Sequence, residues 1–325
     1  MVILITGCSG FIGFHLAKSI LKNKKNTKVV GIDNMNSYYD VDLKKARKKK
    51  LISLDSKNFV FIKADIQNEK KMRKIFSKYK FDLIYHLAAQ AGVRFSINSP
   101  KQYINSNIIG FYNLLECARK NKTKKIFFAS SSSVYGSRRN NLFFKEEFCT
   151  DKPSSFYAAT KKANEIMAYS YSSLYKIKLI GLRFFTAYGP FGRPDMAYYK
   201  FTKKIINNEK IQLYNRGNHL RDFTYIDDVI NSINLLDKNS SKIKSKFEIF
   251  NIGASEPTSL IKFLKIIEKI LGKKAKIKNV SLQMGDVIKT KASISKLKKI
   301  TGYKPKIKIE DGLKKFIRWY KEFNK

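Results

Sequence analysis

The 325-residue sequence predicts an α/β protein, with a doubly wound parallel sheet and a second, smaller domain of mixed α/β structure. Three observations lead to this prediction. Short apolar runs alternate with amphipathic stretches through the first half of the chain. A glycine-rich turn follows the first apolar run and a row of serines follows the fifth, at positions where the strands of such a sheet meet a ligand. After Arg183 the alternation stops, and an aromatic stretch with Pro190 and Pro194 begins.

Each apolar run is short enough to be a buried strand, and each amphipathic stretch has the period of a helix. We predict strands at residues 2–5, 28–32, 59–62, 83–85, 126–128 and 178–182, and helices near residues 12–23, 39–52, 69–79, 101–121 and 156–175. Strands that alternate with helices are joined by right-handed crossovers and lie parallel. Residues 223–252 look like a return to the sheet, whereas residues 254–325 alternate short helices with loops.

The glycine-rich turn has the spacing of a dinucleotide-binding site. Gly7-x-x-Gly10-x-x-Gly13 lies between the first strand and the first helix. The first glycine permits the tight turn, the second lets the backbone approach a pyrophosphate, and the third lets the helix pack on the strand. The helix N-terminus offers free N–H groups and a partial positive charge to the phosphates. We therefore predict a Rossmann domain.

Asp33 indicates which dinucleotide binds. It ends the second predicted strand, 20 residues after Gly13. A carboxylate there accepts hydrogen bonds from the adenosine ribose and repels the extra phosphate of NADP, so we expect NAD. Asp65 is expected at the adenine edge, and the turn Leu87-Ala88-Ala89-Gln90 beside the cofactor. The other predicted NAD-binding residues are Phe11, Ile12, Ile66 and Asn107, together with Tyr157 and Lys161.

Tyr157 and Lys161 form the predicted catalytic pair. They lie four residues apart, on one face of a predicted helix. A phenol with an ordinary pKa of about 10 is a poor base at neutral pH, but a neighbouring ammonium and a positive nicotinamide favour the phenolate. Tyr157 could then take a proton from a sugar hydroxyl while hydride leaves the same carbon. Residues 130–133, all serine, follow the fifth strand, where a hydroxyl can share that proton.

These motifs resemble the extended short-chain dehydrogenase/reductase family over essentially the whole chain. Within that family, RFFTAYGPFGRPDMA at residues 183–197 closely resembles the UDP-glucuronate 4-epimerases. HLAAQAGVR at 86–94, RDFTYIDD at 221–228 and GDV at 285–287, with Thr290 following, support the resemblance. It implies a homodimer that pairs the helix near 101–121 with the helix that carries Tyr157.

The resemblance also implies a reaction, the reversible 4-epimerisation of UDP-glucuronate to UDP-galacturonate. Tyr157 removes the proton of the 4-hydroxyl, and hydride passes from carbon 4 to NAD. The 4-keto sugar turns over and receives hydride on its other face. Lys161 tunes Tyr157 and holds the nicotinamide ribose, and Ser131 supplies the catalytic hydroxyl, four residues before the tyrosine of Val-Tyr-Gly. We expect an NAD-binding domain at 1–182, to which 223–253 returns, and a UDP-sugar domain at 183–222 and 254–325.

The residues at positions 132 and 133, Ser132 and Ser133, distinguish between the reactions that a 4-keto sugar acid can undergo. Related 4,6-dehydratases carry an Asp-Glu pair directly after the catalytic hydroxyl, and related UDP-glucuronate decarboxylases carry a Glu just before Val-Tyr-Gly. Both positions are serine here, so the two rival reactions lack their acid or base. Together with Thr186, these serines are expected to hold the sugar carboxylate, because hydroxyls avoid like-charge repulsion.

The UDP end is predicted from separate residues. Arg221 suits a diphosphate oxygen, because a guanidinium matches phosphate geometry, and Asp286 could accept a uridine ribose hydroxyl. Arg94 and Arg193 border the sugar pocket, where each binds either the substrate or a local carboxylate. Related galactose-type epimerases place an arginine where Gln283 lies, which leaves a second phosphate contact open.

Other functions stay open at this stage. A related enzyme could act on a neutral UDP-hexose or UDP-N-acetylhexosamine, or decarboxylate UDP-glucuronate. The formal charge of +41 suggests a lysine-rich protein that binds RNA or an acidic surface. However, the lysines are scattered along the whole chain, so we expect solvated faces and no specific nucleic-acid partner.

The bulk composition predicts where the protein resides. No apolar run is long enough to span a membrane, and the chain enters a strand at once, so we expect neither membrane insertion nor a secretory signal. The three cysteines have neither disulfide nor metal spacing. We therefore predict a cytoplasmic protein without a metal site, and the class of product suggests a role in polysaccharide synthesis.

Overall fold

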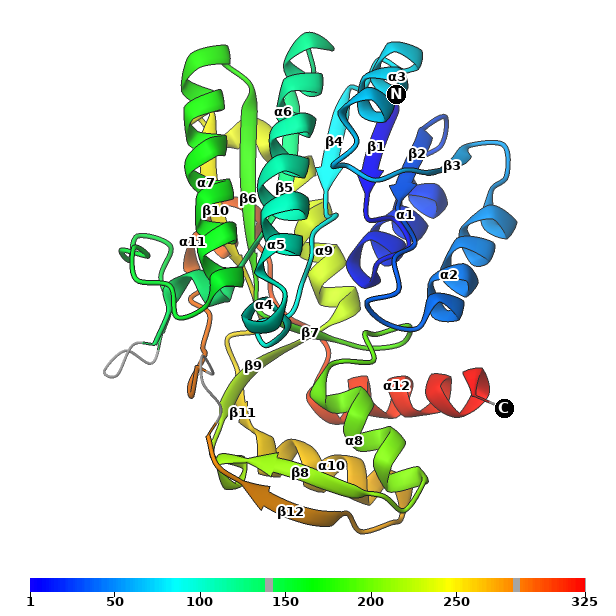
Figure 1. Cartoon of the computed structure of the whole chain (residues 1–325), viewed down its shortest axis with the longest axis vertical. Helices are drawn as coiled ribbons and strands as arrows, with labels where there is room; N and C mark the ends of the chain where they lie inside the picture. The colour runs from blue at the N-terminus through cyan, green and yellow to red at the C-terminus, as the bar shows by residue number, and fades with distance from the viewer. Residues whose placement is uncertain (138–142, 283–286, 325) are drawn as a thin grey trace.

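The large sheet has seven parallel strands in the order β10-β6-β5-β4-β1-β2-β3, which confirms the predicted fold class. We describe a computed structural model at residues 1–137, 143–282 and 287–324 (Figure 1). The strands are β1 (Val2–Thr6), β2 (Lys28–Asp33), β3 (Phe59–Lys63), β4 (Leu83–His86), β5 (Lys125–Ser131), β6 (Lys178–Phe184) and β10 (Phe247–Ile252).

Helices cover both faces of this sheet, because successive strand residues point to opposite sides. On β1, Ile3 and Ile5 pack in one hydrophobic cluster and Leu4 packs in another. The first cluster lies under α1 (Phe11–Asn23), α2 (Val41–Leu54) and α9 (Ile226–Lys238). The second lies under α3 (Glu69–Lys78), α6 (Gly110–Lys120) and α7 (Phe156–Tyr175). Buried on both faces, the strands are short apolar runs without strict alternation.

The smaller part lies beyond the carboxyl ends of the large sheet (Figure 1). A three-stranded sheet joins β7 (Thr186–Tyr188), β9 (Leu220–Tyr225) and β11 (Pro257–Ser259), and a two-stranded sheet joins β8 (Lys210–Tyr214) and β12 (Lys276–Val280). The helices here are α8 (Ala197–Ile206), α10 (Leu260–Leu271) and α12 (Ile309–Phe323), whereas α11 (Ser295–Thr301) packs on α9 and β10 of the large sheet. Of the segment 223–253, β10 joins the large sheet whereas β9 belongs to the small one. The domain boundaries themselves stay a prediction.

The helix predicted near 101–121 differs from the prediction in its middle. It consists of α5 (Pro100–Tyr103), a π-helical turn (Ile104–Ile109) and α6, and it follows the short α4 (Phe95–Asn98). The π turn is closed by the Gly110 N–H, which donates to the Asn105 carbonyl. Within the turn, the Asn107 carbonyl accepts a hydrogen bond of 2.6 Å from Asn164 of α7. A contact with a distant helix therefore accompanies the wider turn, and no local spacing could have predicted it.

Several helices begin with a side-chain cap, whereas α1 does not. Side chains of Asp40, Asn68, Ser155 and Ser259 accept backbone N–H groups at the first turns of α2, α3, α7 and α10. At α1 the N-cap residue is Gly10, which has no side chain to do so. The first N–H groups of α1 therefore remain available to a ligand.

A buried ion pair ties α7 to the sheet. Arg183 on β6 binds Glu165 on α7 through two hydrogen bonds of 2.8 Å, and the side chains are 4% and 5% exposed. Ser130 on β5 donates to the same carboxylate at 2.6 Å. One carboxylate therefore joins three elements. Separately, no helix in the described ranges is both long and apolar enough to cross a membrane.

We predict that Arg183→Met lowers the free energy of unfolding by about 3–5 kcal/mol, because it leaves Glu165 buried without a cation. Urea unfolding followed by circular dichroism measures the loss. Adding Glu165→Leu should recover most of the stability, since the buried charge is then gone. A double variant that is less stable than the single one would contradict this account of the pair.

Candidate active site

The carboxyl ends of the large sheet face a cavity of about 1320 Å³. Residues that follow β1 and β4 line it, at the point where the strand order reverses and where open α/β sheets bind ligands. Residues of β7, β8 and β9 form the opposite wall. The predicted site residues that line the cavity are Gly7, Gly10, Phe11, Ile12, Gly13, Asp33, Ile66, Leu87, Ala88, Ala89, Gln90, Arg94, Ser131, Ser132, Ser133, Tyr157, Lys161, Thr186, Arg193 and Arg221.

The glycine turn has no room for side chains. Gly7 has a φ of +71°, and a Cβ there would lie 2.8 Å from the Ala88 nitrogen. A Cβ on Gly13 would lie 2.1 Å from the Gly7 carbonyl oxygen. The turn therefore packs against the start of α1 as predicted from the spacing, and the uncapped first turn of α1 borders the cavity. This cradle fits a dinucleotide pyrophosphate.

Asp33 is held at the end of β2 by two backbone groups. Its carboxylate accepts N–H groups from Ser9 at 3.0 Å and from Met35 at 2.9 Å. Burial raises its pKa, and these hydrogen bonds oppose that rise. The carboxylate lines the cavity beside the glycine turn, where it can accept ribose hydroxyls.

Asp65 and Asn107 lie behind the cavity wall instead of on it. Asp65 accepts hydrogen bonds of 2.9 Å from the Asn34 side chain and the Gln67 backbone. Asn107 binds both backbone groups of Gln90, at 2.8 and 3.1 Å, and so holds the turn after β4. Direct contacts of Asp65 and Asn107 with a cofactor stay a prediction. Asp286 and Gln283 lie outside the described residues.

The predicted catalytic residues come together from α7 and β5. Tyr157 and Lys161 lie one helical turn apart on α7, and Ser131 ends β5. The Lys161 ammonium donates to the Ala129 carbonyl at 2.9 Å, which anchors it to β5. The Ser133 hydroxyl and backbone N–H both donate to the Ser131 oxygen, at 2.9 and 3.2 Å. The Ser131 hydroxyl therefore has its own proton available to share.

Burial is the largest influence on the pKa values of Tyr157 and Lys161. It raises the pKa of Tyr157, while a hydrogen bond with Ser131 and the charge of Arg193 oppose the rise. It lowers the pKa of Lys161 to about 7, against the attraction of Glu165. We expected Lys161 to favour the phenolate. In the chain by itself the groups that lower the pKa of Tyr157 are Ser131 and Arg193, and desolvation outweighs them.

The three predicted arginines on the sugar side differ in their contacts. Arg193 binds Asp195, the local carboxylate that the sequence left open as a partner. Arg94 lies 4.5 Å over the ring of Tyr214, and Arg221 donates to the Ile288 carbonyl at 2.9 Å. All three line the cavity.

Sequence reasoning missed several residues of the cavity lining. Tyr38 and Asp195 line the cavity and bind each other, and Lys200, Lys203 and Lys204 project from α8. Asp195 lies inside the segment that carries the family resemblance, two residues after Arg193, so that segment held the signal. The α8 lysines are hard to single out in so basic a chain. Their positions give the sugar side of the cavity a positive charge that suits an anionic ligand.

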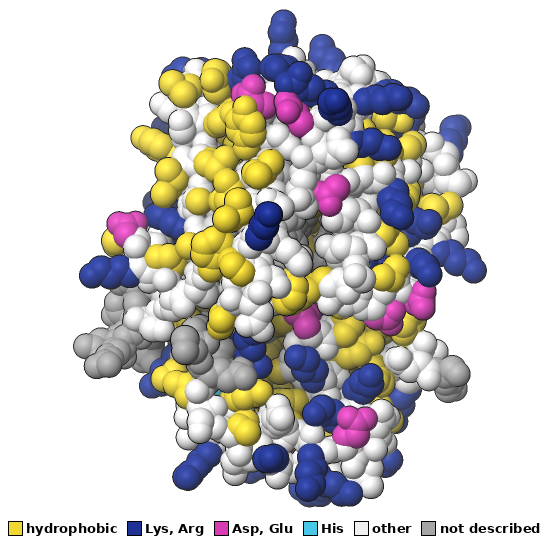
Figure 2. All heavy atoms as spheres, viewed as in Figure 1, with side chains coloured by type: hydrophobic (Ala, Val, Ile, Leu, Met, Phe, Trp, Pro, Cys, Tyr) yellow, Lys and Arg dark blue, Asp and Glu magenta, His cyan; other side chains and the backbone are white. Residues whose placement is uncertain are grey.

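No group of three or more His, Cys, Asp or Glu side chains in the described ranges could hold a metal ion. Lys and Arg side chains are spread across the visible face instead of forming one basic patch (Figure 2).

Comparisons with known proteins agree with this geometry. A family model described as GDP-mannose 4,6 dehydratase matches residues 4–316. An uncharacterized protein of Methanocaldococcus jannaschii is 49% identical over 98% of this chain and 96% of its own. UDP-glucuronate 4-epimerase 5 of Arabidopsis thaliana is 43% identical over 99% of this chain and 76% of the plant protein. The Bacillus cereus UDP-glucuronic acid 4-epimerase, solved in complex with UDP-glucuronic acid and NAD, has a TM-score of 0.91, with 34% identity over 99% of this chain and 100% of its own.

We predict that Lys161→Met lowers kcat about a hundredfold at neutral pH, because Tyr157 then loses the cation that favours its base form. Removing a positive charge raises the pKa of Tyr157 further, so the acid limb of kcat against pH should move to higher pH. The measurement is kcat against pH with the nucleotide sugar that the protein converts.

The matched control is Lys162→Met, since Lys162 binds Thr150 at 2.8 Å and Asp151 at 3.4 Å outside the cavity. Its profile should overlay that of the unmodified protein. A Lys161→Met profile that does the same would show that Lys161 does not tune the base.

Proposed function

The chain belongs to the NAD-dependent epimerase/dehydratase family, the extended short-chain dehydrogenases/reductases, and from that premise we propose that it is a UDP-glucuronate 4-epimerase. In this proposal it interconverts UDP-glucuronate and UDP-galacturonate through a 4-keto sugar, with NAD as the cofactor. The glycine turn, the start of α1 and Asp33 would hold NAD, and Tyr157 and Lys161 would meet its nicotinamide end. The chemistry that NAD supplies when bound is reversible hydride exchange with carbon 4.

The pair Ser132 and Ser133 is the observation that carries the proposal. Both follow Ser131 in a 3₁₀ turn (Ser132–Tyr135) and line the cavity. The matching family model is named for a dehydratase, yet loss of water from carbons 5 and 6 needs an acid and a base beside the sugar. Here hydroxyls occupy the positions that carry those carboxyl groups in related dehydratases and decarboxylases. A 4-keto sugar in this site would be left with reduction as its main fate.

The proton transfer is assigned to residues that are already in contact. Tyr157 would accept the proton of the 4-hydroxyl and return it after the sugar has turned over. The Ser131 hydroxyl would bridge the sugar oxygen and Tyr157, since its own oxygen is satisfied by Ser133. Lys161, anchored to β5, would keep a positive charge beside the phenolate.

The carboxylate of the proposed sugar substrate accounts for the hydroxyl and cationic side chains that line the rest of the cavity. Ser132, Ser133 and Thr186 offer hydroxyl donors, and Arg193 adds a guanidinium. Donors that hold the carboxylate near the plane of the new carbonyl would suppress loss of carbon dioxide, which needs orbital alignment. Arg221 and the α8 lysines would attract the diphosphate. A neutral UDP-hexose or UDP-N-acetylhexosamine would leave much of this positive charge unused.

We expect the purified protein, incubated with UDP-glucuronate and no added NAD, to form UDP-galacturonate, because the enclosed cleft should retain its cofactor. Chromatography of the nucleotide sugars measures the products. If nothing forms, added NAD and neutral UDP-hexoses are tested next, and conversion of a neutral sugar alone would refute the proposal. A UDP-pentose as the main product would identify a decarboxylase.

Thr186→Val is the matched variant for that assay, because it removes one hydroxyl at nearly constant volume. It should raise the share of UDP-4-keto-pentose by-product while UDP-galacturonate still forms. An unchanged share would remove Thr186 from the carboxylate site.

We also propose a homodimer formed through α6 and α7. Both helices expose large hydrophobic side chains, among them Tyr112, Ile166, Tyr169 and Leu174, with exposed fractions of 47%, 59%, 62% and 67%. Figure 2 shows hydrophobic side chains gathered on the face that these helices form. A patch of this kind is typical of an interface. Cys8, Cys117 and Cys149 form no disulfide within the described ranges, which agrees with a reducing, cytoplasmic setting for the proposed reaction.

We predict that Ile166→Glu with Tyr169→Glu yields a monomer, since two charges cannot be buried against their symmetric copies. Light scattering after size exclusion measures the mass. Ile277→Glu on β12, which is 48% exposed, is the control and should leave the mass unchanged. A protein that is monomeric before any substitution would exclude the interface.

A further inference from the structure

Arg193 uses only one edge of its guanidinium within the protein. Its Nε and Nη2 groups donate to the two oxygens of Asp195, at 3.0 and 2.5 Å, and both side chains are 24% exposed. In the ranges that the structure describes, Nη1 has no hydrogen-bond acceptor. A guanidinium has a second edge of paired N–H groups that matches a carboxylate. This second edge is therefore left for a ligand in the cavity.

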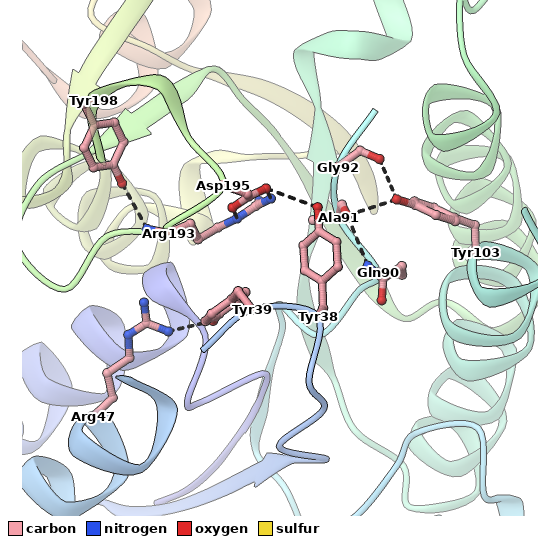
Figure 3. A network of polar contacts seen from close by, with 10 residues as sticks. All are labelled: Tyr38, Tyr39, Arg47, Gln90, Ala91, Gly92, Tyr103, Arg193, Asp195 and Tyr198. Atoms are coloured by element: carbon pink, nitrogen blue, oxygen red, sulfur yellow. Dashed lines mark hydrogen bonds and ion pairs between the residues drawn. The ribbon is translucent and has the colours of Figure 1, made fainter. Parts of the chain in front are cut away.

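Asp195 is itself held from across the cleft (Figure 3). The Tyr38 hydroxyl, from the segment that follows β2, donates to Asp195 at 3.1 Å. The Tyr38 side chain can take this position only because residue 92 is glycine. A Cβ at Gly92 would lie 2.2 Å from the Tyr38 hydroxyl oxygen. The Gly92 carbonyl accepts the Tyr103 hydroxyl at 2.5 Å, which fixes the loop after β4. Burial raises the pKa of Tyr38 to about 12, so its hydroxyl stays a donor.

The backbone around Arg193 is fixed by other groups. Arg47 donates to the carbonyls of Phe191 and Gly192, at 2.6 and 3.2 Å. The Arg193 N–H donates to the Tyr198 hydroxyl at 3.1 Å. Loss of the Tyr38 hydroxyl would therefore leave the loop in place and release only the Asp195 side chain. The Tyr38 hydroxyl therefore sets the orientation of the ion pair between Asp195 and Arg193.

We propose that Tyr38 and Asp195 are positioning residues that direct the second edge of Arg193 toward the carboxylate of the bound sugar, an inference that rests on the proposed function. Tyr157 and Arg193 line the same cavity, and their charges interact. A UDP-sugar acid carries two anionic centres, and the diphosphate has the larger charge. An unrestrained arginine would turn to the diphosphate. Asp195 offsets the charge of Arg193 and holds it at the sugar, while Arg221 and Lys200 remain for the phosphates.

The test is ligand selectivity in NAD-loaded protein with Tyr157→Phe, which keeps the ring and stops proton transfer. Calorimetry measures the dissociation constants of UDP-glucuronate, UDP-glucose and UDP. Tyr38→Phe should weaken UDP-glucuronate about tenfold, the loss expected when a hydrogen bond to a charged group is removed, and change the other two less than about twofold. Asp195→Asn should act in the same direction, and it provides a second reading if either variant folds poorly.

Tyr303→Phe is the matched control, because its hydroxyl donates to the Gly253 carbonyl at 3.3 Å away from the cavity lining. It should leave all three constants unchanged. If Tyr38→Phe and Asp195→Asn weaken the binding of all three ligands equally, Tyr38 and Asp195 only maintain the cavity. If neither variant weakens the binding of UDP-glucuronate, these residues do not direct Arg193. Each result overturns the inference. A protein that, before the Tyr38 and Asp195 substitutions, does not prefer UDP-glucuronate to UDP-glucose would instead refute the proposed function.

Discussion

The ion pair between Glu165 and Arg183 is the contact on which the geometry of the reacting groups depends. It joins α7 to β6, and Ser130 joins the same carboxylate to β5. Lys161 lies one turn before Glu165 on α7, and Ser131 follows Ser130 on β5. The distance between the two elements that carry Tyr157, Lys161 and Ser131 is thus set by a contact just behind them. Because both charges of the pair are buried, loss of either would be costly, so this contact resists rearrangement.

Burial of this part of the molecule also disfavours the charged forms of Tyr157 and Lys161. Burial raises the pKa of Tyr157 and lowers that of Lys161, so both effects act against a charged phenolate–ammonium pair. The chain offsets this only in part, through Ser131 and Arg193. A further positive charge in the pocket would favour the phenolate, and the nicotinamide of NAD has that charge in the proposed reaction. In the proposed reaction, Tyr157 is therefore a weak base in the protein alone and an effective one once NAD is bound.

The sugar side of the cavity is built from both parts of the molecule. Ser132 and Ser133 come from the end of β5, whereas Thr186 and Arg193 follow β6. The segment after β2, together with α2, binds the 191–195 loop twice. Arg47 of α2 binds its backbone. Tyr38 binds Asp195 (Figure 3). That segment begins directly after Asp33, on the proposed NAD side. A site assembled in this way places the proposed sugar-reading residues at a fixed position relative to the cofactor cradle.

The sequence by itself determined the features that depend on a few neighbouring residues. The strand, glycine turn and helix, the carboxylate at the end of β2, and Tyr157 one turn before Lys161 all follow from local spacing, and the alternation of strands and helices predicted the fold class. Only the tertiary structure decided the rest. The π turn at 104–109 accepts a hydrogen bond from Asn164. Arg193 pairs with Asp195, to which Tyr38 also donates. At Tyr157, burial outweighs the effects of Ser131 and Arg193 on the pKa. Apart from the Arg193–Asp195 pair, which lies within one segment, these outcomes depend on groups that are distant in the chain, as with Tyr38 and Asp195, 157 positions apart, and on desolvation, which exists only once the chain is packed.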